Sequence, residues 1–459
     1  MSEIKDLTQG NILRQLMQLA MPIMATSFVQ MAYTMADMAW LGRAGSEEVA
    51  AVGTASFFMW LGLSLLLMTK VGAEVTIAQA LGKKDRKKAG LFAENTVALS
   101  FVLSVLYGAI LFVWAEPIIS FFQLNHPLVE QKAASYLKVI GVGMVFIMGN
   151  PTFSGIFNGV GNSRTPFVFN AVGLVLNILL DPLLIFGWGN TVPAMGAEGA
   201  AIATVLTQVF VGALFVYRLT GSRNPFGGKL WRIPAKAFAK PIFDIGLPVA
   251  LYASLFAIFA MIIARQVAQW GAESVAVQSV GTHIESISWM TAQGLGTALA
   301  SFVGQNFGAG RFDRIRRGFF ITMTVMSTIG LVVTIAFEFF GVPIFGLFIP
   351  EKEAQLLGSL YLQIIGVSQL FMIWEIVCEG LFSGLGKSRI PSIIGIVFTG
   401  LRVPVALLLV EVFGMGIESV WWTISISSLF KGGIMVAWSV LEMRKPVTEA
   451  APILEVAYT

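Results

Sequence analysis

Charged residues are scarce in this sequence, which argues against a soluble protein. Aspartate, glutamate, lysine and arginine make up 12% of the 459 residues, whereas a soluble domain has about 25%. Mean hydropathy is correspondingly high, at +0.78. The net charge of +4 comes mostly from loops between apolar segments, so it indicates membrane topology and not a nucleic-acid partner. We therefore expect a protein embedded in a lipid bilayer, with no nucleic acid bound.

Cysteine and histidine are also nearly absent. Cys378 is the sole cysteine, so no disulfide can form within the chain. The two histidines are His126 and His283, which are too few for a histidine-rich metal site. His283 is also the single histidine in a predicted span, so an intramembrane enzyme such as a protease would have few groups to use as a base. We expect neither catalysis nor a cofactor.

Long apolar runs dominate what remains. Runs of about 20 apolar residues are long enough for a helix to cross about 30 Å of hydrocarbon. They are continuous, whereas strands of a membrane barrel alternate over about ten residues. We predict an all-α polytopic membrane protein with twelve transmembrane helices. The predicted spans are 14–40, 50–79, 91–114, 133–158, 166–188, 197–217, 242–268, 275–303, 317–340, 357–384, 391–411 and 418–441.

The basic residues predict the orientation of these spans. By the predicted boundaries, 22 of the 30 lysines and arginines lie in even-numbered loops or beside the termini. Cytoplasmic loops carry such an excess, so both termini are expected in the cytoplasm of a multi-pass protein of the cell (inner or plasma) membrane. An odd number of spans would have disrupted this pattern.

The chain also repeats itself. Residues 155–166 (GIFNGVGNSRTP) return as 380–391 (GLFSGLGKSRIP) with seven identities in twelve, and Pro22 is matched by Pro248. Repeats of six helices each are parallel, which is a known design of transporters. We predict an N-terminal six-helix lobe over 1–220, a cytoplasmic linker over 221–241, a C-terminal six-helix lobe over 242–445 and a cytoplasmic tail over 446–459.

The repeated segment is not a nucleotide site. Gly380 and Gly386 precede Lys387-Ser388, but the two glycines are six residues apart, whereas the phosphate-binding loop requires five. The first copy has Asn162 in place of the lysine. Transport by this chain would therefore draw on an ion gradient.

Polar stripes on two spans mark candidate sites, because ionisable groups inside a membrane are costly. Helical spacing places Thr26, Gln30, Tyr33 and Asp37 on one face of the first span and Asn170, Asn177 and Asp181 on one face of the fifth. Two carboxylates and an amide could hold a sodium ion through oxygen ligands, or the carboxylates could share a proton. Asp37 could instead face the external headgroups, and Asp181-Pro182 could form a helix-end turn.

The second half of the chain lacks counterparts of Asp37 and Asp181. Its membrane charges are of both signs, which favours internal ion pairs or a lock on the lobe over a second cation site. They are Arg265, Glu285, Glu375, Glu379, Arg402 and Lys431.

Taken together, the chain resembles the multidrug and toxic compound extrusion (MATE) family of cation-coupled exporters. The similarity covers essentially the whole chain. It rests on Pro22 with Asp37 fifteen residues later, on Trp40-Leu41-Gly42, on the repeated turn, and on Asn177-x-x-x-Asp181-Pro182 followed by the segment 199–204 (GAAIAT). The residues favour the DinF-like branch, because the seventh span lacks the carboxylate that the NorM-like branch places there.

This resemblance implies a site and a mechanism. It implies that Asp37, Asn177 and Asp181 bind the coupling proton or sodium ion, with Tyr33 nearby and with Thr204 and the backbone of Ala200 as further contacts. Further expectations are a substrate cavity that includes Gln30, Met31 and Asn170, and a hinge at Pro22, where a proline weakens the helix.

We therefore expect a monomeric antiporter that exports drugs and toxic organic cations by alternating access, in exchange for H⁺ or Na⁺. Amphipathic aromatic cations would bind between lobes lined by aromatic and methionine side chains. The alternative is a lipid-linked oligosaccharide flippase of the same superfamily, whose pyrophosphate group could use Arg265, Arg402 and Lys431. The sequence does not choose between the two ions or assign roles to Glu375 and Glu379.

Overall fold

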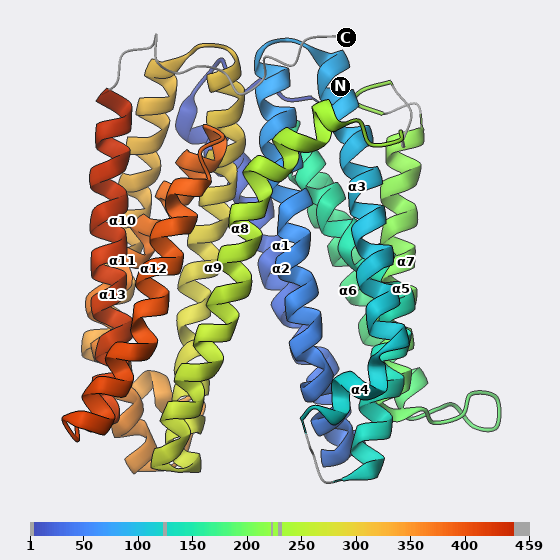
Figure 1. The fold of residues 1–459 in the computed structure, drawn as a ribbon, viewed down its shortest axis with the longest axis vertical. Coiled ribbons are helices and arrows are strands. Elements are labelled where there is room, and N and C mark those ends of the chain that lie inside the picture. The colour runs from blue at the N-terminus through green and yellow to red at the C-terminus, as the bar shows by residue number, and fades with distance from the viewer. Residues whose placement is uncertain (1–3, 123–125, 222–223, 228–231, 445–459) are drawn as a thin grey trace. The chain divides into compact units, whose positions relative to one another are not determined.

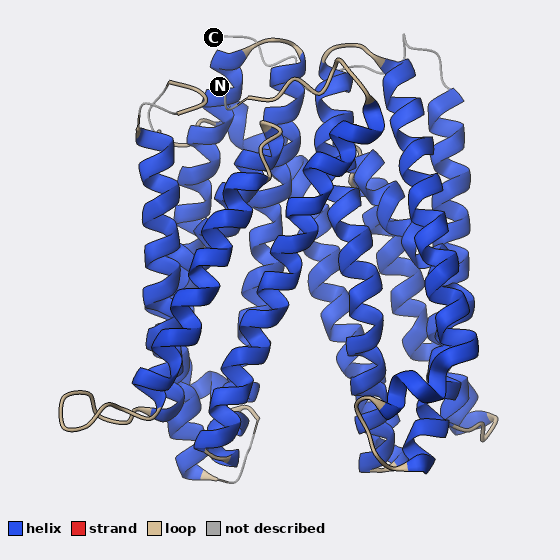
Figure 2. Cartoon of the chain, turned by 180° about the vertical axis from the view of Figure 1, so that it is seen from behind, coloured by secondary structure: helices blue, strands red, loops and turns tan. Residues whose placement is uncertain are grey.

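The computed structural model describes residues 4–122, 126–221, 224–227 and 232–444, and in these it is helical, with no strand (Figure 2). Figure 1 labels the helices in chain order. Twelve of the described helices are long, and the connections between them include the short helix α4 (Ala115–Ser120), a 3-10 turn (Ala268–Trp270), a π-helical turn (Leu408–Val412) and loops. The long helices are α1 (Ile12–Ala44), α2 (Ser46–Gly82), α3 (Arg86–Val113), α5 (Pro127–Gly159), α6 (Arg164–Ile185), α7 (Gly196–Thr220), α8 (Lys236–Val267), α9 (Ala272–Gly308), α10 (Phe312–Gly346), α11 (Lys352–Gly384), α12 (Arg389–Leu407) and α13 (Ile417–Arg444).

Each predicted span coincides with one of these long helices, so the prediction of an all-α fold with twelve spans is confirmed. Among the described residues, eleven helices are both long and apolar enough to cross a membrane. The twelfth, α9, is 37 residues long but rich in serine, threonine, glutamine and glycine, which lowers its hydropathy. Its length still exceeds the roughly 20 residues that a membrane requires.

The described chain divides into two units. The N-terminal unit comprises residues 4–6 and 25–247, and the C-terminal unit comprises 7–24 and 248–444, apart from the gaps noted above. Two helices therefore belong to both units. α1 starts in the C-terminal unit and continues into the N-terminal unit after residue 24, and α8 does the reverse after residue 247. The repeated prolines Pro22 and Pro248 lie beside these two crossing points.

The repeated sequence folds in the same way in both units. Gly161 follows α5 with φ +84°, and Gly386 follows α11 with φ +77°. After each glycine, the next amide donates a hydrogen bond to the carbonyl five residues back, at 2.9 Å and 2.7 Å. Glycine is favoured here because this left-handed backbone strains a residue with a side chain. The repeat is therefore a helix-ending turn.

Glycines within the repeat also let the helices pack closely. A Cβ atom on Gly155 would lie 2.5 Å from the carbonyl oxygen of Lys70 on α2, and one on Gly380 would overlap the backbone of Gly296 on α9. Small residues at such crossings bring helix backbones into contact, which is how helices associate where lipid removes the hydrophobic drive.

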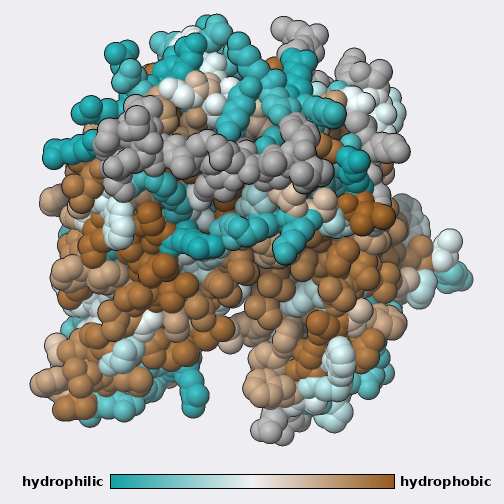
Figure 3. All heavy atoms as spheres, turned by 45° about the horizontal axis from the view of Figure 1, so that its top comes forward, coloured by the Kyte–Doolittle hydropathy of each residue, from teal (hydrophilic) through white to brown (hydrophobic). Residues whose placement is uncertain are grey.

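Each unit has its own apolar core, and apolar side chains also cover the flanks of the helices. Exposed examples are Leu106, Leu179 and Phe339. On the face drawn in Figure 3, these apolar flanks give way to hydrophilic side chains toward one end of the helices. An apolar band bounded by polar ends is what a bilayer requires of the surface it contacts. The predicted tail 446–459 and parts of the predicted linker 221–241 lie outside the described residues.

Candidate functional site

Two carboxylates from different helices face each other inside the N-terminal unit. Asp37 lies on α1 and Asp181 on α6, and their side chains approach closely enough to interact directly. The Asn177 side-chain amide, one turn before Asp181, donates to Asp181 Oδ1 at 3.0 Å. Asn177 and Asp181 are fully buried, and Asp37 is half-buried. The structure thus brings together the acidic ends of both polar stripes.

Hydroxyl groups from α1 and α7 complete the cluster. Tyr33, one turn before Asp37, lies close to Asp37 and also to Thr204 and Thr207. Thr204 and Thr207 are buried and occupy neighbouring positions on α7. A Cβ atom on Gly199 at the start of α7 would lie 2.4 Å from the carbonyl oxygen of Leu184 at the end of α6, so glycine lets these two helices approach closely. These side chains come from α1, α6 and α7.

Six side-chain oxygens of this cluster are buried and accept or donate no hydrogen bond within the described chain. Buried polar atoms are normally satisfied, so a concentration of unsatisfied ones indicates a missing partner. The atoms are Tyr33 Oη, Asp37 Oδ1, Asn177 Oδ1, Asp181 Oδ2, Thr204 Oγ1 and Thr207 Oγ1.

Chemically, this oxygen-rich cluster can neutralise its two acids in two ways. A proton can sit between the carboxylates, because two adjacent carboxylates repel when both are charged. A hard cation can instead take carboxylate, amide and hydroxyl oxygens as ligands. In the described residues no three histidine, cysteine or acidic side chains gather in the manner of a metal centre, so a cation would depend on the neutral oxygens as well.

Comparison with known proteins identifies the lineage. The model of the MatE family matches residues 22–183 and 248–408, one match in each half. The probable multidrug resistance protein NorM of Thermotoga maritima is 31% identical over 416 residues, which cover 89% of this chain and 88% of that protein. The chain belongs to the MATE family. It is therefore a membrane transporter.

Solved structures support the same fold for this MATE protein. A MOP superfamily transporter from Pyrococcus furiosus matches with a TM-score of 0.86 and 24% identity, covering 95% of this chain and 97% of that one. A MATE protein solved in the bent conformation matches with a TM-score of 0.83 and 25% identity, covering 95% and 96%.

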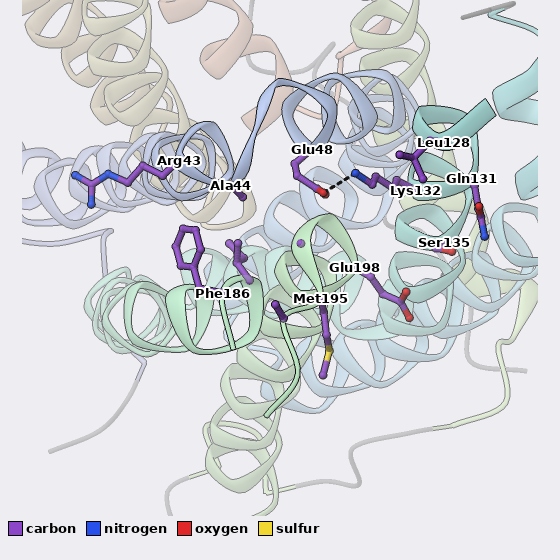
Figure 4. Close-up of a pocket in the computed structure, with 13 residues that line it drawn as sticks. Arg43, Ala44, Glu48, Leu128, Gln131, Lys132, Ser135, Phe186, Met195 and Glu198 are labelled. Atoms are coloured by element: carbon purple, nitrogen blue, oxygen red, sulfur yellow. Dashed lines mark ion pairs between the residues drawn. The ribbon is translucent and has the colours of Figure 1, made fainter. Parts of the chain in front are cut away.

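A pocket of about 560 Å³ opens in the same unit of this MATE protein, where α1 and α6 end and α7 begins. Ile185, one turn beyond Asp181, lines it, as does Ala44, two turns beyond Asp37. Figure 4 shows Lys132 and Glu48 meeting at its wall, and their charged atoms are 2.8 Å apart. Glu48 also accepts a hydrogen bond of 2.6 Å from the backbone amide of Ala197 at the start of α7.

The other predicted residues take up several positions on α1, α6 and α7. Gln30 is exposed and Met31 half-buried on α1, and neither is among the residues that contact the two carboxylates. The Asn170 amide donates to the carbonyl of Pro166 on its own helix at 2.7 Å. Pro22 lies inside α1, fifteen residues from Asp37. Ala200 is buried on α7, one turn before Thr204.

Two members of the cluster, Thr207 and Tyr136, were not predicted from the sequence. Thr207 lies three residues after Thr204, a spacing that places both on one helical face and could have identified it. Tyr136 on α5 is buried within electrostatic range of Asp37 and Asp181. No local pattern marks Tyr136, because its proximity depends on how α5 packs against other helices.

The C-terminal unit of this MATE protein holds a different polar cluster. Lys431 Nζ on α13 lies 2.8 Å from Glu375 Oε1 on α11, and both side chains are almost fully buried. The Tyr252 hydroxyl on α8 also donates to Glu375 Oε1, at 3.1 Å. Glu379 is one turn after Glu375, and Arg265 is exposed near the end of α8. An internal ion pair thus forms among the mixed charges of the second half.

Proposed function

We propose that this protein is a multidrug efflux antiporter driven by H⁺ or Na⁺, whose substrates are amphipathic, often cationic aromatic compounds. The relative in Thermotoga maritima carries the name of a multidrug resistance protein, which supports the assignment. The observation that carries the coupling proposal is the meeting of Asp37 and Asp181 among buried oxygens that lack partners.

The coupling ion acts at this cluster. Two ionised carboxylates in a water-poor interior are costly, so the site gains most when a proton or a sodium ion neutralises them. Asn177 orients Asp181 by its 3.0 Å hydrogen bond to Oδ1, and Asp181 Oδ2 and Asp37 Oδ1 remain for the ion. Tyr33, Thr204 and the backbone of Ala200 provide further oxygens. This N-terminal location favours the DinF-like branch.

Ion binding at Asp37 changes the conformation of α1, and this change affects the bound substrate. Asp37 lies on the part of α1 that belongs to the N-terminal unit, and Pro22 lies just before the point where the helix passes between units. Proline removes one helical hydrogen bond and eases bending. Neutralising Asp37 makes the polar stripe of α1, including Gln30, less polar, and the helix bends at Pro22. A MATE relative has been solved in the bent conformation.

Bending of α1 drives alternating access in this scheme. Drug bound beside Gln30, Met31 and Asn170 leaves toward the outside when the coupling ion enters. The pocket beside Ile185 and Ala44 gives the ion its approach from the external side, because these two residues follow Asp181 and Asp37 on the same helices within a single unit. The protein works as a monomer in the cell membrane, with both termini in the cytoplasm.

The test is transport in vesicles that contain only this protein. A fluorescent cationic dye is loaded, and a proton gradient or a sodium gradient is imposed separately. Dye movement under one gradient identifies the coupling ion, and the Asp37→Asn variant should then lose the response. Asn177→Ala should weaken the response without removing it, since both carboxylates remain. Dye movement in wild type that ignores both gradients would refute cation coupling.

A further inference from the structure

Arg402 is a charged residue of the C-terminal unit that has no carboxylate partner among the described residues. It lies on α12, thirteen residues after the helix begins at Arg389, or about 20 Å along the axis. That depth is well inside the roughly 30 Å hydrocarbon layer. The side chain is half-buried, so part of it remains accessible. An arginine at such a depth is costly and is normally paired or functional.

Two serines hold the guanidinium in place. Arg402 donates from Nε to Ser427 Oγ at 2.5 Å and from Nη2 to Ser428 Oγ at 2.9 Å, both on α13. Hydroxyl groups orient the guanidinium but do not neutralise it. Within the described part of the chain, no carboxylate forms an ion pair with Arg402, and Nη1 has no hydrogen-bond acceptor.

The neighbouring acids are engaged elsewhere. Glu375 is neutralised by Lys431 and accepts a second hydrogen bond from Tyr252. Glu285 on α9 accepts a long hydrogen bond of 3.4 Å from Tyr361 and lies within electrostatic range of Arg402 without touching it. Arg402 therefore presents an oriented positive charge with a free donor, and Glu285 lies within electrostatic range of it.

We propose that Arg402 binds the carboxylate of an acidic aromatic substrate. An arginine with free donors is the side chain best suited to a carboxylate, because its N–H groups match the carboxylate oxygens in direction and spacing. A bound carboxylate supplies the negative charge that none of the described side chains pairs with Arg402. Glu285 serves the basic group of a substrate that carries both charges.

This inference rests on the proposed export function and assigns to Arg402 the recognition of one group on the substrate. A purely structural role for Arg402, joining α12 to α13 through the two serines, would affect all substrates equally. The two roles are distinguished by a pair of xanthene dyes that share one cationic ring system. One dye carries a free carboxylate, and the other carries the methyl ester of the same group.

Binding of both dyes to the purified full-length protein is measured by fluorescence anisotropy in a neutral detergent. Arg402→Gln should weaken binding of the acid by about tenfold to a hundredfold, the range for a lost charge-assisted hydrogen bond, while binding of the ester changes little. Arg402→Lys should restore part of the difference, because the charge returns without the paired donors. Arg317→Gln, at an exposed position of α10, is the matched control and should leave both affinities unchanged.

Equal losses for acid and ester in Arg402→Gln, or no binding of the acid to wild type, would overturn the inference. The same holds if added phosphatidylglycerol abolishes the preference for the acid, because the site would then belong to a lipid headgroup. Vesicle transport separates this inference from the proposed function. Efflux that does not depend on Arg402 refutes the inference alone, whereas Arg402-dependent binding without ion-driven efflux refutes the function alone.

Discussion

Replacing Lys431 with methionine should destabilise the protein by about 3–5 kcal/mol, the usual cost of leaving one partner of a buried ion pair without the other. Lys431 and Glu375 have side-chain exposures of 3% and 4%, so water cannot replace the lost partner. Methionine matches the lysine stem in length, and the effect is therefore electrostatic and not a cavity. Glu375→Met should cost a similar amount, because it leaves the ammonium group alone.

The structure also sets the size of the coupling between the two residues. At the observed 2.8 Å, two unit charges attract by about 6 kcal/mol for an effective dielectric of about 20, before the cost of burying them is subtracted. The double variant carries neither charge. Its remaining cost is the unpaired hydroxyl of Tyr252, which is about 1–3 kcal/mol. The double variant should therefore be more stable than either single variant.

The assay is equilibrium unfolding in mixed detergent micelles, with the free energy extrapolated linearly from each transition. The control is Lys138→Met, which removes an ion pair to Glu116 at an exposed position and should leave stability almost unchanged. If the double variant costs the sum of the two single variants within about 0.5 kcal/mol, the residues are independent and the reasoning is wrong.

Three further predictions concern transport and topology. Asp37→Asn and Asp181→Asn should each abolish dye export while the protein still reaches the membrane at wild-type level, because asparagine cannot ionise. Wild-type drug resistance of cells carrying each variant would show that the coupling site does not lie in the N-terminal unit. Pro22→Ala should reduce transport but preserve dye binding, and spin-label distances between α1 and α6 should then stop responding to the coupling ion. In the wild type, a distance distribution that never changes with pH or sodium would contradict bending of α1. The cysteine of Lys87→Cys, in a Cys378→Ala background, should not react with impermeant thiol reagents applied to intact cells. Rapid labelling would show that the predicted orientation in the membrane is wrong.

Much of the fold is predictable because its signals are local. Hydropathy and helical length mark the spans, and the duplicated turn that ends in Gly161 and Gly386 marks the repeat, since each needs only a few consecutive residues. α9 shows the limit of hydropathy, because its small polar residues obscure a helix of 37 residues. The polar stripes of α1 and α6 likewise follow from spacing, so Asp37 and Asp181 could be named in advance.

The tertiary structure decided which side chains meet. Periodicity gives the face of a helix but not the rotation and depth at which that face packs, so the approach of Tyr136 to Asp37 and Asp181 could not be foreseen. The passage of α1 from one unit to the other depends on long-range packing for the same reason. In the C-terminal unit, spacing cannot show that Lys431 pairs with Glu375 while Arg402 rests on two serines, because these partners lie on different helices.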